Sequence, residues 1–134
     1  MARIFPYVIS VAGKYDATIY LMHVVEDFSH WGGFYTPHLP FVQFHEEAIK
    51  SAERTLDELC SEQFQRYPNL RKKIAFGDPA TEILKAIEQE KIDLVIMGTH
   101  GRKDLELVFF GSVAENVVKK SSAPVLTINP YKVK

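Results

Sequence analysis

One short stretch of the chain limits the fold more than any other: an apolar run, a glycine-rich loop and an amphipathic segment, in that order. The run Leu94–Met97 has four consecutive apolar residues and ends at Gly98, which is typical of a buried parallel strand. From Ser112 onward, apolar residues recur at helical spacing. Further glycines, Gly101 and Gly111, lie between the two elements. The sequence therefore predicts a strand, a glycine loop and a helix start within an α/β sheet.

Such a loop has the chemistry to hold phosphate. Glycine lets the backbone approach a ligand without a Cβ in the way, and the first turn of a helix offers free N–H groups with a partial positive charge. Ser112 is expected either to cap the helix or to share its N–H groups with an anion. Taken singly, Gly98 and Gly101 could serve only a tight turn. The spacing Gly-x2-Gly-x9-Gly-Ser is neither the Walker pattern nor G-x-G-x-x-G.

This spacing resembles the nucleotide-binding signature of the universal stress protein family, in its ATP-binding branch. Four segments resemble that family in the right order, namely Leu21–Val25, Ile92–Gly101, Gly111–Val117 and Ser122–Leu126. The resemblance implies that the triphosphate contacts Gly98, Gly101, Gly111, Ser112 and Val113. It implies that adenine or ribose lies near Val24 and Met97. His100 and Arg102 lie beside the loop and are also expected to meet phosphate.

Strand and helix patterns alternate along the chain. Strands are expected over residues 3–5, 17–25, 71–76, 93–97 and 125–129, and the main helices over 7–15, 46–66, from 79 onward and 112–120. The alternation predicts one doubly wound domain over residues 1–134, with a five-stranded parallel sheet and helices on both faces. The family resemblance implies the strand order 3-2-1-4-5, with a ligand crevice between strands one and four.

Composition narrows the classes of partner. The chain has 134 residues, 46% of them apolar, which is enough for one core. The net charge of −1 makes nucleic acid an unexpected partner, and no apolar stretch is long enough to cross a membrane. No signal-peptide h-region follows Met1, so the cytoplasm is the expected compartment. The single cysteine, Cys60, falls on the apolar face of a predicted helix and reads as a structural thiol.

No catalytic or metal-binding set is evident. His45-Glu46-Glu47 does not continue as H-E-x-x-H, and His100 is the only acid–base side chain near the predicted phosphate site. We therefore expect a dimeric ATP-binding regulatory module of the stress-response type, with Mg²⁺ as a possible companion of ATP. The alternatives are a slow ATP hydrolase or nucleotidyl-transfer enzyme, and a nucleotide-free interaction module. The aromatic loop over residues 28–35 reads as a lid, a partner surface or a loop folded on itself.

The fifth predicted strand is the expected dimer surface. Val125–Ile128 is apolar, and in the family's strand order it lies at a sheet edge, where an open apolar strand favours pairing with a second chain. The resemblance also implies pairing there.

The N-terminus departs from the family pattern. Only Pro6–Asp16 separates the first two predicted strands, whereas a crossover with its helix takes at least about 10–12 residues. The family's loop between first strand and first helix, which bears an aspartate toward the nucleoside, has no counterpart here. Roughly a dozen residues are absent between Phe5 and Pro6, judged against that crossover length. Either the gene lost them, or the sequence closes over a segment that a crystal does not show. We favour the second account, because a nucleotide-contacting loop is a natural place for disorder when the site is empty. An ordinary Phe5–Pro6 junction would favour the first account and leave the nucleoside half of the site incomplete.

Overall fold

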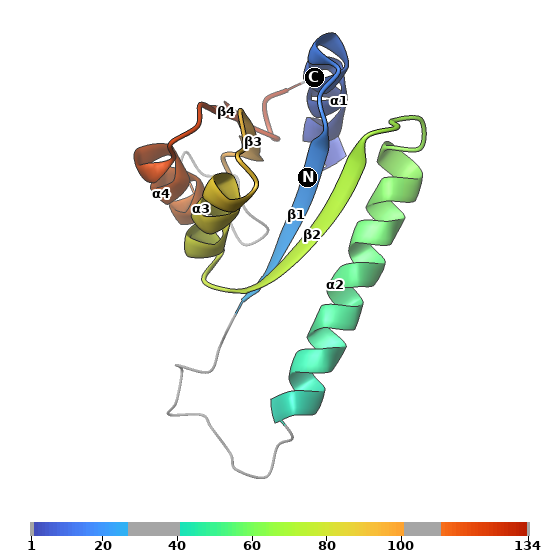
Figure 1. The fold of residues 1–134 in the computed structure, drawn as a ribbon, viewed down its shortest axis with the longest axis vertical. Helices are drawn as coiled ribbons and strands as arrows, with labels where there is room; N and C mark the ends of the chain where they lie inside the picture. Colours follow the sequence, from blue (N-terminus) through green and yellow to red (C-terminus); the bar gives the residue numbers. More distant parts are fainter. Residues whose placement is uncertain (1, 27–40, 101–110, 134) are drawn as a thin grey trace. The chain divides into compact units, whose positions relative to one another are not determined.

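The computed structural model describes residues 2–26, 41–100 and 111–133 (Figure 1). The chain groups into two compact units. The terminal unit combines Met1–Ala17 with Ala80–Lys134, and the central unit is Thr18–Pro79. Each unit contains strands that pair in parallel and helices that pack on them, so the α/β class predicted from the sequence is confirmed.

The central unit is one strand pair covered by one long helix. Strand β1 (Ile19–Glu26) pairs in parallel with β2 (Leu70–Gly77) along its whole length. Helix α2 (Phe41–Gln63) lies along both strands (Figure 1). Ala52 and Leu56, one helical turn apart, are buried on α2, as an amphipathic helix packed on a sheet requires. The three predicted elements exist, but α2 begins five residues before its predicted start.

The terminal unit holds the predicted glycine loop. Its main elements are α3 (Pro79–Gln89), β3 (Val95–Gly98), α4 (Ser112–Lys120) and β4 (Val125–Ile128), with β3 and β4 paired in parallel. Ala80, Ile87 and Val117 form one buried cluster. Apolar side chains from β3 and β4 pack against this cluster, so both helices and both strands share one core. The helix predicted over 112–120 has the predicted bounds.

The predicted first strand is wrong. Residues Ala2–Ile4 form a short 3₁₀ helix, and α1 (Phe5–Tyr15) follows it at once. Pro6 stands in the first turn of α1, where its fixed φ suits a helix and its missing N–H is not needed. Ile4 and Phe5 are buried, so the apolar run packs inside the unit without joining a sheet. Phe5 and Pro6 are consecutive residues of one continuous helix, and the account of the absent loop stays a prediction.

The strand order 3-2-1-4-5 is not confirmed. Among the described residues, the strands form two separate parallel pairs, β1 with β2 and β3 with β4. These pairs correspond to the predicted neighbours 3-2 and 4-5. The strand that would lie between them in a five-stranded sheet is the one whose residues are helical here.

Candidate functional site

Two backbone hydrogen bonds bring the end of β3 and the start of α4 together. The N–H of Thr99 donates to the carbonyl oxygen of Ile128 at 2.9 Å, which extends the β3–β4 ladder by one residue. The N–H of Gly111 donates to the carbonyl oxygen of Thr99 at 2.6 Å. The second bond closes the glycine loop at its base. Of the predicted site residues, Gly98 and His100 are thereby held next to Gly111 and the first turn of α4, as the strand–loop–helix prediction requires.

The first turn of α4 has no capping side chain among the described residues. Gly111 is the N-cap, with φ −58° and ψ 146°, and its carbonyl oxygen accepts from the N–H of Glu115 at 2.9 Å. Ser112 is therefore the first helical residue and not the cap, so of its two predicted roles the N-cap is wrong. It is exposed, and its carbonyl oxygen accepts from the amide Nδ2 of Asn116 at 3.0 Å. A helix start without a side-chain cap leaves N–H groups that attract an anion.

Within the described part of the chain, no neighbour of Gly98 requires a glycine there. Its φ is not in the left-handed region, which among the described glycines only Gly77 occupies. A Cβ added at Gly98 would lie 3.6 Å from the carbonyl oxygen of His100, 3.8 Å from that of Ile128 and 4.0 Å from Cδ of Pro130, all ordinary contacts. The alternative that this glycine serves only a tight turn therefore finds no support in its geometry.

His100 is buried, with 8% of its surface exposed, beside the equally buried Thr99. Its Nδ1 lies 2.7 Å from Oγ1 of Thr99, and its ring meets the ring of Tyr131 edge to face, with centroids 5.3 Å apart and planes at 78°. The imidazole of His100 therefore contacts Thr99 and Tyr131 within the protein. From the sequence we had expected this ring to meet phosphate. Sequence reasoning missed Thr99 and Tyr131; Tyr131 follows the last strand in a segment without periodicity, so no pattern pointed to it.

The remaining predicted site residues fall into three places. The side chains of Met97, expected near the nucleoside, and Val113, expected at the triphosphate, both pack against the buried cluster of the terminal unit. Val24 lies half-buried in β1 of the central unit. Gly101 and Arg102 lie outside the described residues, as does the aromatic loop over residues 28–35.

Metal binding, membrane crossing and thiol reactivity find no supporting feature in the described part of the chain. Within it, no three His, Cys, Asp or Glu side chains gather as metal ligands would. None of the described helices combines the length and apolar character of a membrane span.

Cys60 is half-buried, and burial raises the pKa of its thiol despite the nearby Lys72 ammonium. A raised pKa disfavours the reactive thiolate, in line with the structural reading of Cys60.

Comparison with known proteins decides the family. The model of the universal stress protein family matches residues 2–129. The chain belongs to the universal stress protein family. Universal stress protein MJ0531 of Methanocaldococcus jannaschii is 33% identical over 138 residues, covering 94% of this chain and 73% of the relative. Universal stress protein MJ0577 of the same organism is 41% identical over 83 residues, covering 62% of this chain and about half, 49%, of the relative.

Solved structures agree with the assignment. Universal stress protein UspA from Lactobacillus plantarum superposes with a TM-score of 0.76 at 26% identity, covering 93% of this chain and 86% of that one. Two structures of lower identity share the fold. One is a universal stress protein in complex with cAMP, with a TM-score of 0.57 and 17% identity, covering 96% of this chain and 87% of that one. The other is a family protein from Arabidopsis thaliana with AMP bound, with a TM-score of 0.65 and 19% identity, covering 95% and 76%.

Proposed function

We propose that this universal stress protein binds an adenine nucleotide, ATP by preference, with the phosphates held between the end of β3 and the start of α4. It acts as a dimeric regulatory module of a cytoplasmic stress response. The phosphate contacts are the backbones of Gly98, Gly101, Gly111 and Val113 with the hydroxyl of Ser112; Arg102 supplies charge, and Val24 and Met97 border the nucleoside. Mg²⁺ arrives as a companion of ATP.

One observation carries the proposal. The hydrogen bond from the N–H of Gly111 to the carbonyl oxygen of Thr99 brings the start of α4 close to Gly98. The start of α4 has no side-chain cap, and the described neighbours of Gly98 leave room for a Cβ. A fold that tolerates alanine at Gly98, yet carries glycine there, is what close approach of a ligand to the backbone would produce. The AMP and cAMP complexes of family members are in keeping with an adenine nucleotide as that ligand.

The imidazole of His100 has a different place in this proposal from the one expected from the sequence. Because the ring is buried against Thr99 and Tyr131, we assign it to the support of the loop and leave phosphate contact to the backbone. Binding, and not rapid hydrolysis, is therefore the activity proposed.

The test is a Gly98→Ala variant. Its methyl group meets only ordinary contacts among the described residues, so its thermal unfolding should match that of the wild type. The same methyl group would collide with a bound phosphate, and ATP affinity measured by calorimetry should fall about tenfold or more. Gly13→Ala on α1, where an added Cβ has nothing within 4 Å, is the matched control and should bind ATP as the wild type does.

Two further measurements complete the test. Mass spectrometry of the natively purified protein should detect bound adenine nucleotide, and Gly101→Val should remove ATP binding. Full affinity in Gly98→Ala and Gly101→Val would overturn the assignment of the phosphate site.

The dimer is proposed through the free side of β4. Among the described strands β4 pairs only with β3, and Leu126 on β4 is 41% exposed although it is a large apolar residue. Leu126→Asp should give a monomer in light scattering, because a charge at an apolar strand edge opposes pairing. Ile128 is 7% exposed and unsuitable for this test, since a charge there would disturb the core. A wild-type protein that is monomeric at high concentration would contradict the proposal.

A further inference from the structure

The residues that follow β4 are also folded. Residues Asn129–Val133, here named the C-terminal turn, fold back immediately after the strand. The side-chain Oδ1 of Asn129 accepts from the N–H of Tyr131 at 3.0 Å, and its carbonyl oxygen accepts from the N–H groups of Lys132 at 3.1 Å and Val133 at 3.2 Å. An asparagine that bonds the backbone two residues ahead fixes a tight turn. The C-terminal turn is thus an ordered continuation of β4.

The C-terminal turn lies against the base of the glycine loop. Pro130 is buried, and its Cδ lies 4.0 Å from the position of a Cβ built on Gly98. Tyr131 places its ring edge to face on the buried ring of His100, at 5.3 Å between centroids. His100 in turn meets the hydroxyl of Thr99 through Nδ1 at 2.7 Å. The turn therefore contacts His100, at which the described part of the loop ends, and lies beside the position that a Cβ on Gly98 would take.

The N-terminal segment contacts the same turn. Nη1 of Arg3 donates to the carbonyl oxygen of Pro130 at 3.4 Å. An open cavity of about 530 Å³ is lined by Arg3, Pro6, Tyr7 and Val133, so α1 and the C-terminal turn border one hollow of the terminal unit. The turn thus contacts Arg3 through Pro130 and His100 through Tyr131.

We propose that Tyr131 is a positioning residue for the nucleotide: through His100 it holds the Thr99 carbonyl where the loop closes on Gly111. This inference rests on the proposed phosphate site. The carbonyl of Thr99 accepts the Gly111 N–H, and that bond sets the distance between β3 and the first turn of α4. When Tyr131 is lost, the imidazole loses its edge-to-face contact, the loop base loosens, and the phosphate site loses its preformed shape. Because binding then includes an ordering cost, nucleotide affinity falls.

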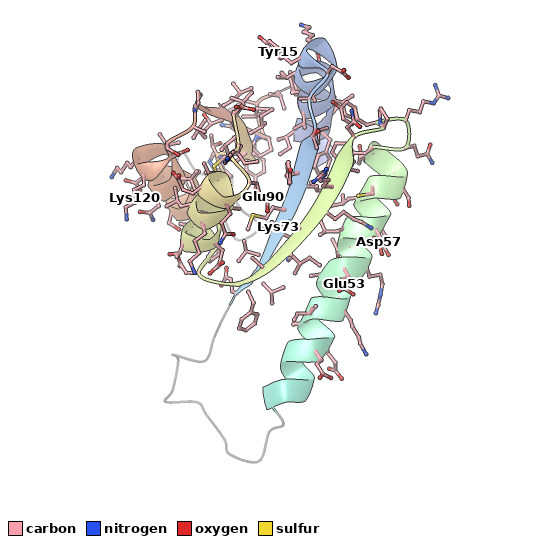
Figure 2. All side chains as sticks on the ribbon, viewed as in Figure 1. Tyr15, Glu53, Asp57, Lys73, Glu90 and Lys120 are labelled. Atoms are coloured by element: carbon pink, nitrogen blue, oxygen red, sulfur yellow. The ribbon has the colours of Figure 1, made fainter. Side chains whose placement is uncertain are left out.

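The experiment compares Tyr131→Leu with Tyr131→Phe. Leucine keeps apolar bulk but removes the aromatic edge, and ATP affinity should fall about three- to tenfold by calorimetry, the range that an aromatic pair is worth. Phenylalanine keeps the edge-to-face contact and should restore wild-type affinity. The control is Tyr15→Leu, at the far end of α1, whose side chain is 78% exposed and points away from the unit (Figure 2). It should bind as the wild type does.

A second variant addresses the possibility that Tyr131→Leu fails to fold. Thr99→Val has nearly the same shape but lacks the hydroxyl that meets Nδ1 of His100. It should lower ATP affinity in the same range while its thermal unfolding stays cooperative. Wild-type binding in both folded variants would overturn the positioning role and leave the proposed function intact. Absence of ATP binding in the wild type would instead overturn the proposed function itself.

Discussion

The two halves of the proposed nucleotide site differ in how the chain builds them. The phosphate half lies within the terminal unit, where Thr99 and Gly111 are joined by a backbone hydrogen bond and Thr99 is joined to Ile128 by another. The nucleoside half is a proposal that rests on the family resemblance, which implies contacts at Val24 and Met97. In addition, the family resemblance implies a first strand and an aspartate-bearing loop near the N-terminus, whereas residues 2–15 are helical here.

The difference shows which part of a ligand site a short motif can build. A strand, a loop and the next helix are joined through the chain, so a few local bonds fix the phosphate half. A nucleoside site between distant strands needs the central strand of the sheet as well. In this chain we expect binding energy to come mainly from phosphate contacts.

The largest expected effect is on stability. Ile87→Ala removes a buried side chain of the terminal unit, 4% exposed, and Leu56→Ala removes one of the central unit, 2% exposed. Each should lower the free energy of unfolding by about 2–5 kcal/mol, because the truncation leaves a cavity. If residues 1–134 form the single domain predicted from the sequence, both variants shift one common urea transition, followed by circular dichroism. Val118→Ala, at a 45% exposed position, is the control and should change stability by less than about 0.5 kcal/mol. Two separate transitions, each moved by only one variant, would show that the units fold independently.

The second effect is on ATP affinity. Ser112→Ala removes the exposed hydroxyl at the start of α4, and a hydrogen bond to a charged phosphate oxygen is worth about 1.5–3 kcal/mol. ATP affinity measured by calorimetry should therefore fall about tenfold or more. Val24→Ala in β1 should cost less, because it trims only an apolar contact to the nucleoside. The reverse ranking would mean that the nucleoside half dominates binding.

A third measurement compares ligands. Inorganic tripolyphosphate carries the phosphates without the nucleoside, and adenosine carries the nucleoside alone. If the nucleoside half is incomplete, tripolyphosphate should compete with ATP at an affinity within about tenfold, whereas adenosine should compete only weakly. Competition against a fluorescent ATP analogue measures both. Strong adenosine competition would show that the nucleoside half is complete.

The sequence was informative where a pattern spans one element. Helix α4 was predicted with the bounds Ser112–Lys120, since Gly111 and the terminal lysines mark its ends. Helix α2 begins at Phe41, before its predicted start at Glu46, because the aromatic residues ahead of Glu46 read as part of a loop. Helix boundaries are also less marked by periodicity than helix interiors.

The sequence misled where a segment was too short to show a period. The three residues Arg3–Phe5 are compatible with a strand and with a helix, because they are too few to show a period. In the structure this segment is helical, and Ile4 and Phe5 are buried. The position of His100 depends on its contact with Tyr131, thirty-one residues away in the chain, which periodicity does not report. Local motifs were therefore readable, whereas contacts across the terminal unit were not.

The smallest expected effect is electrostatic and lies in the phosphate half. The carboxylate of Glu115, in the first turn of α4, accepts a hydrogen bond from Nζ of Lys119 at 2.8 Å. That hydrogen bond and the attraction of the ammonium hold the pKa of Glu115 below its usual value. A carboxyl whose pKa is lower in the folded than in the unfolded chain stabilises the fold above the unfolded pKa, about 4.3 for Glu. This stabilisation is lost as the pH falls through the folded pKa.

Glu115→Gln should therefore be slightly less stable than the wild type near pH 7, and the difference should vanish as the solution is acidified below about pH 4. Both side chains are more than half exposed, so the difference should also shrink in 1 M salt, where the Debye length is only about 3 Å. Urea unfolding of both proteins as a function of pH measures it. A difference that grows on acidification would mean that Glu115 is held protonated in the folded protein. The same variant removes a negative charge beside the proposed phosphates, so its ATP affinity should rise while its stability falls. A purely structural role for Glu115 would lower the stability without raising the ATP affinity.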